Sequence, residues 1–398
     1  MRPATTGPAA GGTGRAAEGG RALRVFVTHP GASLYGSDRM LLEAVRGMAA
    51  AGLEPVLCVP GPGPLVDEVA SWGVPVEICP VPVLRKSALS PRGALRLLGT
   101  SARSLLRGAA ALRRTRPDVV YVSTVTTPSW VLLARAMGLP VVCHVHEAES
   151  GVRPAVQRVL TSPLLAASTL LVNSRFALEV LLRSWPQLSG RAGVVLNGVA
   201  GPPAGTPAPR RPGEPARVLY VGRLSERKGV LVALEAVESL VRSGADVHLD
   251  LVGDVFAEHA EFADRLRERT RALERAGRVT LHGFEDDVWP HLASCDVLVV
   301  PSVLPEPFGN TAVEGVLAGR PVVASDIGGL PEALEGYRSA RLVPAGDATA
   351  LALAIRDVVA DLPDLAVLAV QDARAAAERH APRGFQRAVV EQLLAVAR

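Results

Sequence analysis

The chain has 398 residues, of which 48% are hydrophobic, 21% charged and 4% aromatic, and its formal net charge is +4. These values are typical of a folded globular protein, and the length allows two domains of about 100 to 200 residues each. The small net charge implies no electrostatic partner for the whole molecule, and the scarcity of aromatic side chains argues against a surface that stacks bases, so we expect no nucleic-acid partner.

The cysteines indicate a reducing compartment. Cys58, Cys79, Cys143 and Cys295 are far apart and show no metal-binding or redox spacing. We expect them to be reduced core residues, which fits a cytoplasmic protein. No uncharged run reaches about 18 residues and the N-terminus lacks an apolar signal core, so neither a transmembrane helix nor secretion is predicted.

Residues 1–21 are rich in Gly, Ala, Thr and Pro and are predicted to form a disordered tail. Residues 22–200 alternate short apolar runs with helical patterns, which is typical of βα units around a parallel sheet. The strands of this domain are predicted at Leu23–Thr28, Pro55–Val59, Val74–Ile78, Val119–Ser123, Pro140–Val145, Thr169–Val172 and Gly193–Leu196.

Residues 201–216 have the composition of a linker and precede a second alternating series, residues 217–383. Its strands are predicted at Arg217–Val221, Val247–Val252, Val279–Leu281, Val297–Val300, Pro321–Ala324 and Ala340–Val343. The predicted fold class is therefore α/β, with two Rossmann-like doubly wound domains and a hinge near residue 205. Because open parallel sheets bind ligands beyond the carboxyl ends of their strands, we expect a site in the cleft between the domains.

Two loops of the first domain carry candidate site residues. Gly36 precedes a helical pattern, and a glycine there lets backbone amides approach a phosphate or a sugar. His144 and His146 share one face of a predicted strand, but no third ligand is signalled, so no metal site is predicted. We expect His144 to be a hydrogen-bonded core residue, whereas His146 and Glu147 at the strand's end are better placed for substrate contact.

A basic segment runs from Arg85 to Arg116. It contains eight arginines and one lysine, no Asp or Glu, and interleaved leucines, a pattern typical of a basic amphipathic helix. One interpretation is a helix that packs on its own sheet and exposes an arginine face to solvent. The other is a peripheral surface that docks on anionic lipid headgroups.

The first strand of the second domain leads into a loop that contains Arg223 and Lys228. Two cations just beyond a strand end, with glycines that allow close backbone approach, suit a diphosphate. Lysine is rare in this chain, since only Lys86 and Lys228 are lysines among the 43 Lys and Arg residues. The placement of one of them here favours a phosphate site.

The segment from Glu306 to Glu314 contains two carboxylates between a strand pattern and a helix pattern. Pro307 pushes Glu306 out of the helical region, so Glu306 is predicted to be a loop residue. Thr311 and Glu314 fit a capping box, which places Glu314 in the first helical turn. The unpaired amides at such a helix start bind anions such as phosphate. The alternative is that Glu314 only completes the capping box and Glu306 is a solvated loop residue.

In this order along the chain, the motifs resemble those of the GT-B retaining glycosyltransferases of family 4, and the likeness extends from Leu23 to the C-terminus. The motifs that carry it are Tyr35-Gly36-Ser37-Asp38, His146-Glu147, Asn173-Ser174, Leu196-Asn197-Gly198-Val199, Gly222-Arg223 with Lys228-Gly229, Gly253-Asp254, His282-Gly283-Phe284, Glu306 to Glu314, and Ser325-Asp326-Ile327-Gly328-Gly329-Leu330-Pro331-Glu332. Many members have two adjacent glycines where this chain has Tyr35-Gly36, which leaves one backbone contact unassigned.

The resemblance implies a role for each matching position. Arg223 and Lys228 would hold the diphosphate of the donor, the amides of Phe308, Gly309, Asn310 and Thr311 would face its phosphate or sugar, and Glu314 would bind the ribose. Glu306 and His146 would lie beside the transferred sugar, Gly36 would approach from the opposite domain, and Phe284 would mark the base. The last helix, about 384–398, would cross back onto the first domain.

The implied reaction moves a sugar, with retention of configuration, from a UDP- or GDP-sugar to a hydroxyl of a saccharide, a lipid-linked or a natural-product acceptor. No cofactor and no metal are expected. Two alternatives remain open. Paired carboxylates also serve glycosidases, although a loop and a helix position assigned to opposite ends of one donor suit them poorly. The second alternative is a non-catalytic GT-B-like protein that binds sugar nucleotide or stabilises a biosynthetic partner.

Overall fold

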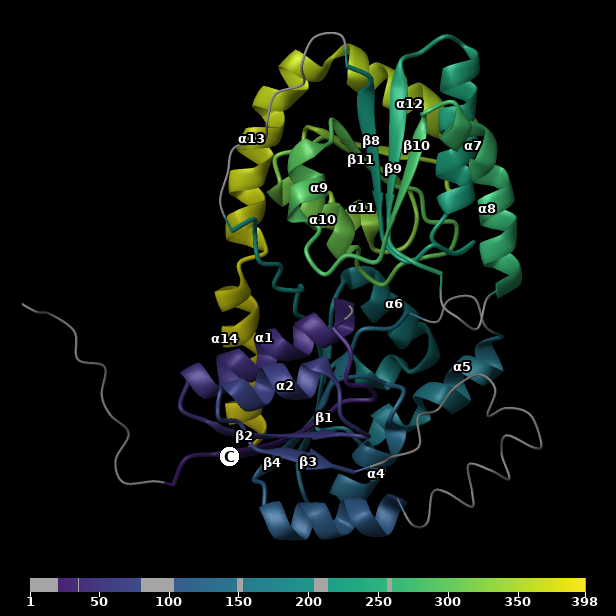
Figure 1. Cartoon of the computed structure of the whole chain (residues 1–398). Helices are drawn as coiled ribbons and strands as arrows, with labels where there is room; N and C mark the ends of the chain where they lie inside the picture. Colours follow the sequence, from purple (N-terminus) through teal and green to yellow (C-terminus); the bar gives the residue numbers. More distant parts are fainter. Residues whose placement is uncertain are drawn as a thin grey trace, which may run out of the picture.

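The computed structural model describes residues 21–34, 36–79, 104–148, 153–203, 214–255 and 260–397. These residues form two domains, one above the other in Figure 1, and each domain is built on a parallel sheet with helices on both faces. Residues 1–20 of the predicted tail, the basic segment before residue 104 and linker residues 204–213 lie outside the described ranges.

The N-terminal domain contains a seven-stranded parallel sheet of order β3-β2-β1-β4-β5-β6-β7. Its strands are β1 (Arg24–Thr28), β2 (Glu54–Val59), β3 (Val76–Ile78), β4 (Val119–Val122), β5 (Val141–Val145), β6 (Thr169–Val172) and β7 (Ala192–Val194). Its helices are α1 (Gly36–Ala50), α2 (Pro64–Ser71), residues 104–115, α4 (Pro128–Ala136), α5 (Pro154–Thr161), α6 (Arg175–Ser184) and the 3-10 turns η2 (Ser162–Ala166) and η3 (Pro186–Leu188). Helices α1 and α2 cover one face of the sheet, and residues 104–115, α4 and α6 cover the other.

The C-terminal domain contains a six-stranded parallel sheet of order β10-β9-β8-β11-β12-β13. Its strands are β8 (Ala216–Val221), β9 (Val247–Val252), β10 (Val279–Gly283), β11 (Val297–Val300), β12 (Val322–Ser325) and β13 (Ala340–Val343). Its helices are α7 (Val230–Arg242), α8 (Ala260–Arg275), α9 (Trp289–Ser294), α10 (Asn310–Leu317), α11 (Leu330–Ala333), α12 (Ala348–Ala360) and α13 (Leu362–Arg379). Helices α7, α8 and α12 cover one face, and α9, α10, α11 and part of α13 cover the other.

The final helix, α14 (Pro382–Val396), returns to the N-terminal domain. Figure 1 shows α13 beside the upper domain and α14 beside α1 of the lower one. Phe385 and Leu393 of α14 are buried in the same core as α1. The segment between α13 and α14 lies next to the place where the chain first leaves the N-terminal domain, because the Val199 amide donates to the His380 carbonyl oxygen at 3.0 Å. The two connections between the domains therefore lie side by side at Val199 and His380, a place that we call the hinge.

All thirteen predicted strands are present in the described residues, and their ends differ from the prediction by at most two residues. The prediction succeeded because the central strands are apolar and buried on both faces, as β4, β5, β11 and β12 show. The four cysteines are free and buried, as predicted. None of the described helices combines the length and apolar character that a membrane span requires.

Candidate functional site

The carboxyl ends of the two sheets face each other, because loops that follow strands make contacts between the domains. Ser174, after β6, donates from Oγ to the carbonyl oxygen of Pro307, after β11. Asn197, after β7, donates from Nδ2 to Oδ1 of Asn310 at 2.8 Å. Doubly wound sheets bind ligands at this edge. The candidate site therefore lies between the domains, around residues 305–310.

Lys228 and Glu306 form an ion pair at the centre of this region. Lys228 Nζ lies 2.7 Å from Glu306 Oε2, and the exposed fractions of the two side chains are 29% and 8%. Ser302 Oγ donates a hydrogen bond to Glu306 Oε1. Burial alone would raise the pKa of Glu306, but the charge and hydrogen bonds of Lys228 and Ser302 hold it below its ordinary value. The structure thus contradicts the interpretation of Glu306 as a solvated residue and supports its prediction as a loop residue.

The two loops that carry this pair are fastened to each other. The Arg227 guanidinium donates to the Pro305 carbonyl oxygen at 2.8 Å, and the Arg227 carbonyl oxygen accepts from the Val303 amide at 2.9 Å. Gly229 has φ 73°, and a Cβ there would lie 1.8 Å from the Pro301 carbonyl oxygen. Only glycine allows this approach. The backbone therefore fixes Lys228 against the loop that ends at α10.

Helix α10 begins one residue after Gly309, which is the N-cap at φ 124° and supplies no side-chain cap. The predicted capping box is therefore wrong, because the backbone freedom of Gly309 starts the helix at Asn310 rather than after Thr311. Glu314 is the fifth residue of α10 and lies beyond the first turn. The amides of Asn310 and Thr311 have no intrahelical acceptor at this position, so the anion site expected at the helix start is retained.

Phe308 packs its ring into the core below this helix start. Its side chain is 2% exposed and meets the ring of His380 edge to face, with centroids 5.7 Å apart. The ring is therefore part of the core and is not available for contact with a ligand. The contact joins the loop at the site to the hinge between α13 and α14.

Glu314 points into the same region from α10 and is half-buried. Burial raises its pKa to about 7, and the charges of Arg39 and Lys228 oppose that rise. Arg39 belongs to α1 in the N-terminal domain, so charges from both domains act on this carboxyl group. Glu314 and Glu306 therefore differ in environment, since Glu306 has a half-buried cation, Lys228, as a direct ion-pair partner.

Gly36 is the first residue of α1 and is exposed. A Cβ on Gly36 would lie 3.8 Å from Asn310 Nδ2, so the starts of α1 and α10 face each other across the domain boundary. Both helix dipoles direct their positive ends to this point. Tyr35 lies outside the described residues.

Arg223 and Phe284 follow strands of the C-terminal sheet. Arg223 is exposed after β8, and its carbonyl oxygen accepts a hydrogen bond from the Tyr220 hydroxyl at 2.8 Å. Phe284 directly follows β10 and is 50% exposed. An exposed ring at a strand end suits stacking against a flat group. The acidic turn that follows, Glu285 to Asp287, is exposed, as expected of a solvated turn.

The histidines at β5 differ in their surroundings. His144 is fully buried, and the Tyr121 hydroxyl lies 2.6 Å from its Nδ1, which confirms the prediction of a core histidine. His146 lies just past β5 and is half-buried, and burial lowers its pKa to about 3, with His29 contributing. The two rings are 3.8 Å apart at their centroids. His146 is therefore a neutral side chain at the edge where the domains meet.

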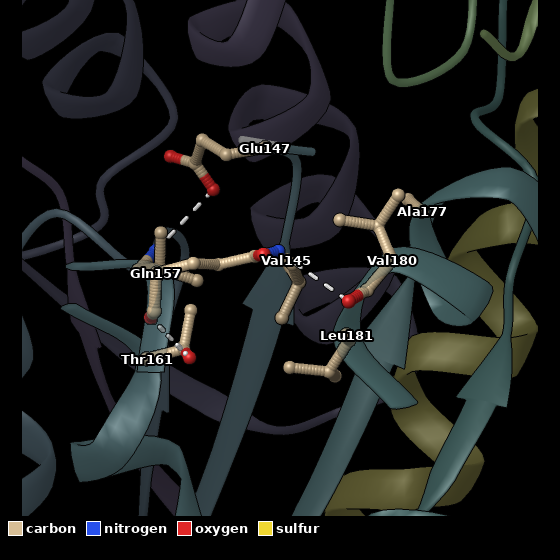
Figure 2. A pocket seen from close by; sticks show the side chains of 8 residues that line it. Val145, Glu147, Gln157, Thr161, Ala177, Val180 and Leu181 are labelled. Carbon is tan, nitrogen blue, oxygen red and sulfur yellow. Dashed lines mark hydrogen bonds between the residues drawn. The ribbon is translucent and has the colours of Figure 1, made fainter. Parts of the chain in front are cut away.

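Glu147 turns inward rather than toward the opposite domain. It accepts hydrogen bonds from the Thr124 hydroxyl, from the amide of His146 at 3.1 Å and from that of Val125 at 3.4 Å. Figure 2 shows Glu147 at one side of a small pocket between β5, α5 and α6, with Val145, Ala177, Val180 and Leu181 as apolar walls. The expectation that Glu147 contacts substrate is not supported, because its carboxylate caps the loop after β4.

Several contacts at the boundary were not predicted from the sequence. Glu332 of α11 accepts from the backbone amides of Arg175 at 2.7 Å and Phe176 at 3.4 Å, at the start of α6 in the other domain. Arg39 donates to the Asp286 carbonyl oxygen at 2.7 Å, also across the boundary. These contacts join residues more than 150 positions apart, and no local pattern encodes them. The described residues include no group of His, Cys, Asp and Glu side chains arranged to hold a metal ion.

Comparison with known proteins follows the two-domain division. Residues 35–200 match the family described as Glycosyltransferase Family 4, and residues 215–361 match Glycosyl transferases group 1. Glycogen synthase of Mycobacterium tuberculosis (strain CDC 1551 / Oshkosh) is 33% identical over 281 residues, which cover 67% of this chain and 65% of the relative. A 2-deoxystreptamine N-acetyl-D-glucosaminyltransferase of Streptomyces fradiae is 29% identical over 371 residues, 82% of this chain and 83% of the relative.

The fold is shared with solved structures over nearly the whole chain. Anabaena Alr3699/HepE in complex with UDP-glucose superposes with a TM-score of 0.77 at 21% identity, covering 94% of this chain and 100% of that chain. The match includes both parallel-sheet domains, and the family matches span the residues that carry the sequence motifs. The chain therefore belongs to the family 4 glycosyltransferases (glycosyl transferases group 1) and has the GT-B fold.

Proposed function

We propose that this chain is a retaining glycosyltransferase that moves a sugar from a UDP- or GDP-sugar to a hydroxyl of a saccharide, lipid-linked or natural-product acceptor. The observation that carries the proposal is the Lys228–Glu306 pair at 2.7 Å, next to the start of α10 and at the boundary between the domains. A buried carboxylate held by a cation beside a helix N-terminus suits a sugar attached to a phosphate.

The diphosphate would lie against the cations and the helix start. When the bond between the anomeric carbon and the phosphate oxygen breaks, the leaving diphosphate gains negative charge. Arg223, Lys228 and the amides of Asn310 and Thr311 would stabilise this charge by electrostatics that are in place before the reaction. On this proposal no metal is needed for departure of the leaving group.

Retention follows if the acceptor hydroxyl attacks the face that the diphosphate leaves. The acceptor oxygen then bonds to the anomeric carbon, and its proton passes to the departing phosphate oxygen. Glu306 would orient the sugar rather than attack it, because Lys228 and Ser302 occupy its carboxylate oxygens. His146, whose pKa is held low by burial, would accept a hydrogen bond from a sugar or acceptor hydroxyl.

Glu314 would receive the ribose hydroxyls, and Phe284 would stack on the base. Binding of UDP-glucose by the structural neighbour Alr3699/HepE favours a uridine nucleotide, and the names of the relatives refer to glycogen and to 2-deoxystreptamine.

The proposal is tested by a donor screen that measures acceptor-dependent release of nucleoside diphosphate. Lys228→Met and Glu306→Gln are the test variants, and Arg356→Met, an exposed arginine on α12, is the matched control. We expect release to fall by about 10²-fold or more in both test variants and to persist in the control. Donor binding without turnover on any saccharide, lipid or natural-product acceptor would instead favour the non-catalytic alternative.

We also propose that residues 104–115 dock on anionic phospholipid, which would make the protein a peripheral cytoplasmic one. Arg107 and Arg113 are exposed on this helix, and Leu106 beside them is 72% exposed. Exposed leucine among arginines suits an interfacial helix. Flotation with phosphatidylglycerol vesicles should capture the wild type but not Arg107→Glu/Arg113→Glu, with Arg183→Glu as control; equal capture of all three would contradict docking at this helix.

A further inference from the structure

Arg39 reaches from the N-terminal domain into the nucleotide half of the candidate site. It lies in the first turn of α1, three residues after Gly36. Its Nη2 donates to the carbonyl oxygen of Asp286 at 2.7 Å, in the turn between β10 and α9. Phe284 lies in the same turn. The guanidinium therefore links the helix that faces α10 to the loop that carries the exposed ring.

The charge of the same guanidinium also acts on a second candidate contact, the Glu314 carboxyl group. Among the charges that oppose the effect of burial on Glu314, Arg39 acts more strongly than Lys228. Arg39 belongs to α1, whereas Lys228 belongs to the loop between β8 and α7. One cation from each domain thus acts on the Glu314 carboxyl group. Arg39 therefore contacts the turn after Phe284 and acts electrostatically on the Glu314 carboxyl group.

A guanidinium has five N–H donors in a planar fork. One of them donates to Asp286, so the group has further donors for oxygen atoms of a ligand at this place. A ligand with a flat base, a ribose and phosphates presents several such oxygen acceptors. A lysine would keep the charge but lose the fork.

We propose that Arg39 is a positioning residue that completes the nucleotide-binding site from the opposite domain, by tying the turn after Phe284 to α1 and presenting its guanidinium beside Glu314. This inference rests on the proposed function. It explains how bringing the domains together would assemble the site, because this side chain of the N-terminal domain contacts the turn after Phe284 in the C-terminal domain. It also assigns a role to a residue that the family motifs leave aside.

The test is titration calorimetry of UDP-glucose and GDP-mannose with the wild type, Arg39→Met and Arg39→Lys. These donors have no phosphate ionisation near neutral pH, so the pH dependence of binding reports the protein. Arg46→Met is the matched control, because Arg46 lies on the same helix and pairs with Glu43 and Glu68 away from the site. We expect affinity for the preferred donor to fall about tenfold in Arg39→Met and to be unchanged in Arg46→Met.

A pH series separates positioning from a general structural effect. In the wild type, donor affinity should rise as Glu314 ionises near pH 7. Arg39→Met should move this midpoint to higher pH, and Arg39→Lys should restore the midpoint while remaining weaker in affinity. If Arg39→Met bound the donor with the affinity and the pH midpoint of the wild type, the role proposed for Arg39 would be overturned but the proposed function would not. Failure of the wild-type protein to bind any sugar nucleotide would overturn the proposed function, and this inference with it.

Discussion

Lys228 and Glu306 lie on different loops and meet at 2.7 Å, with the Glu306 side chain 8% exposed. A carboxylate buried to this extent requires a partner cation, since removing one member of a buried pair leaves the other uncompensated. The pair is therefore expected to contribute both to the proposed reaction and to the stability of the fold. A variant at either position changes both the candidate chemistry and the free energy of unfolding.

Lys228→Met should lower the free energy of unfolding by about 3 kcal/mol at pH 7, because it leaves the Glu306 charge buried without a cation. Urea denaturation measures this loss. The double variant Lys228→Met/Glu306→Gln should recover most of the stability but none of the glycosyl transfer. If the double variant were as unstable as the single one, the pair would not be the cause.

The buried histidine at the hinge should make stability sensitive to acid. Burial, followed by the charge of Arg379, lowers the pKa of His380 to about 4. The unfolded chain, in which a histidine has a pKa of about 6.5, then binds the extra proton between these values, so stability is lost as pH falls below about 6.5. His380→Phe should reduce the loss between pH 7.5 and 5.5 by about 1.4 kcal/mol, measured by urea denaturation.

The effect of Glu314 on the pH dependence of stability should be opposite in sign to that of His380. Its folded pKa of about 7 lies above the ordinary 4.5, so the folded state binds the extra proton and the contribution of Glu314 to stability falls as pH rises through this window. Protonation of Glu314 therefore offsets part of the stability that the wild type loses as pH falls. Glu314→Gln removes this offset, so the free energy of unfolding should fall more steeply with decreasing pH, whereas His380→Phe should make it fall less steeply. An unchanged pH slope in both variants would contradict these assignments.

The glycine at the end of the Lys228 loop should tolerate no side chain. Gly229→Ala places a Cβ 1.8 Å from the Pro301 carbonyl oxygen at φ 73°, whereas Gly277→Ala meets no atom within 4 Å at φ 67°. Both substitutions carry the cost of left-handed backbone, about 1–2 kcal/mol, and only Gly229→Ala adds a clash. Urea denaturation should show a clearly larger loss for Gly229→Ala. Equal losses of stability in the two variants would mean that the loops carrying Gly229 and Pro301 move apart at no cost in free energy.

The contact between α11 and α6 should favour the domain arrangement seen here. Glu332 accepts from the amide of Arg175 at 2.7 Å, and Arg175 Nε lies 3.5 Å from Glu332 Oε1. Glu332→Ala removes a carboxylate from a helix N-terminus, an interaction of about 1 kcal/mol, and should increase the radius of gyration measured by X-ray scattering. Glu378→Ala, exposed on α13, is the control. If Glu332→Ala and Glu378→Ala gave identical scattering, the contact of Glu332 with α6 would not be what favours this domain arrangement.

The central strands were predictable because each is a short apolar run that the sheet buries on both faces. The pairing of Lys228 with Glu306 was not, since it depends on how two loops from different βα units approach. Both residues were singled out from local pattern and placed at different parts of the donor, and neither pattern indicated that they touch. Ser302 gave no signal, because a serine in a loop is common.

The helix start at Gly309 shows why local rules failed at the site. The capping rule favours Thr311, whose side chain resembles a cap, but a glycine at φ 124° forms the turn instead. Arg39 was missed for a different reason. Its contact with Asp286 spans the two domains, and only their arrangement brings the residues together.

The most direct test of the central claim is the anomeric configuration of the product formed from an α-linked UDP- or GDP-sugar with the preferred acceptor, read from the proton coupling constant by NMR. We expect an α-linked product, formed by the wild type and by Arg356→Met and lost in Lys228→Met. A β-linked product, or transfer that is undiminished in Lys228→Met, would contradict it.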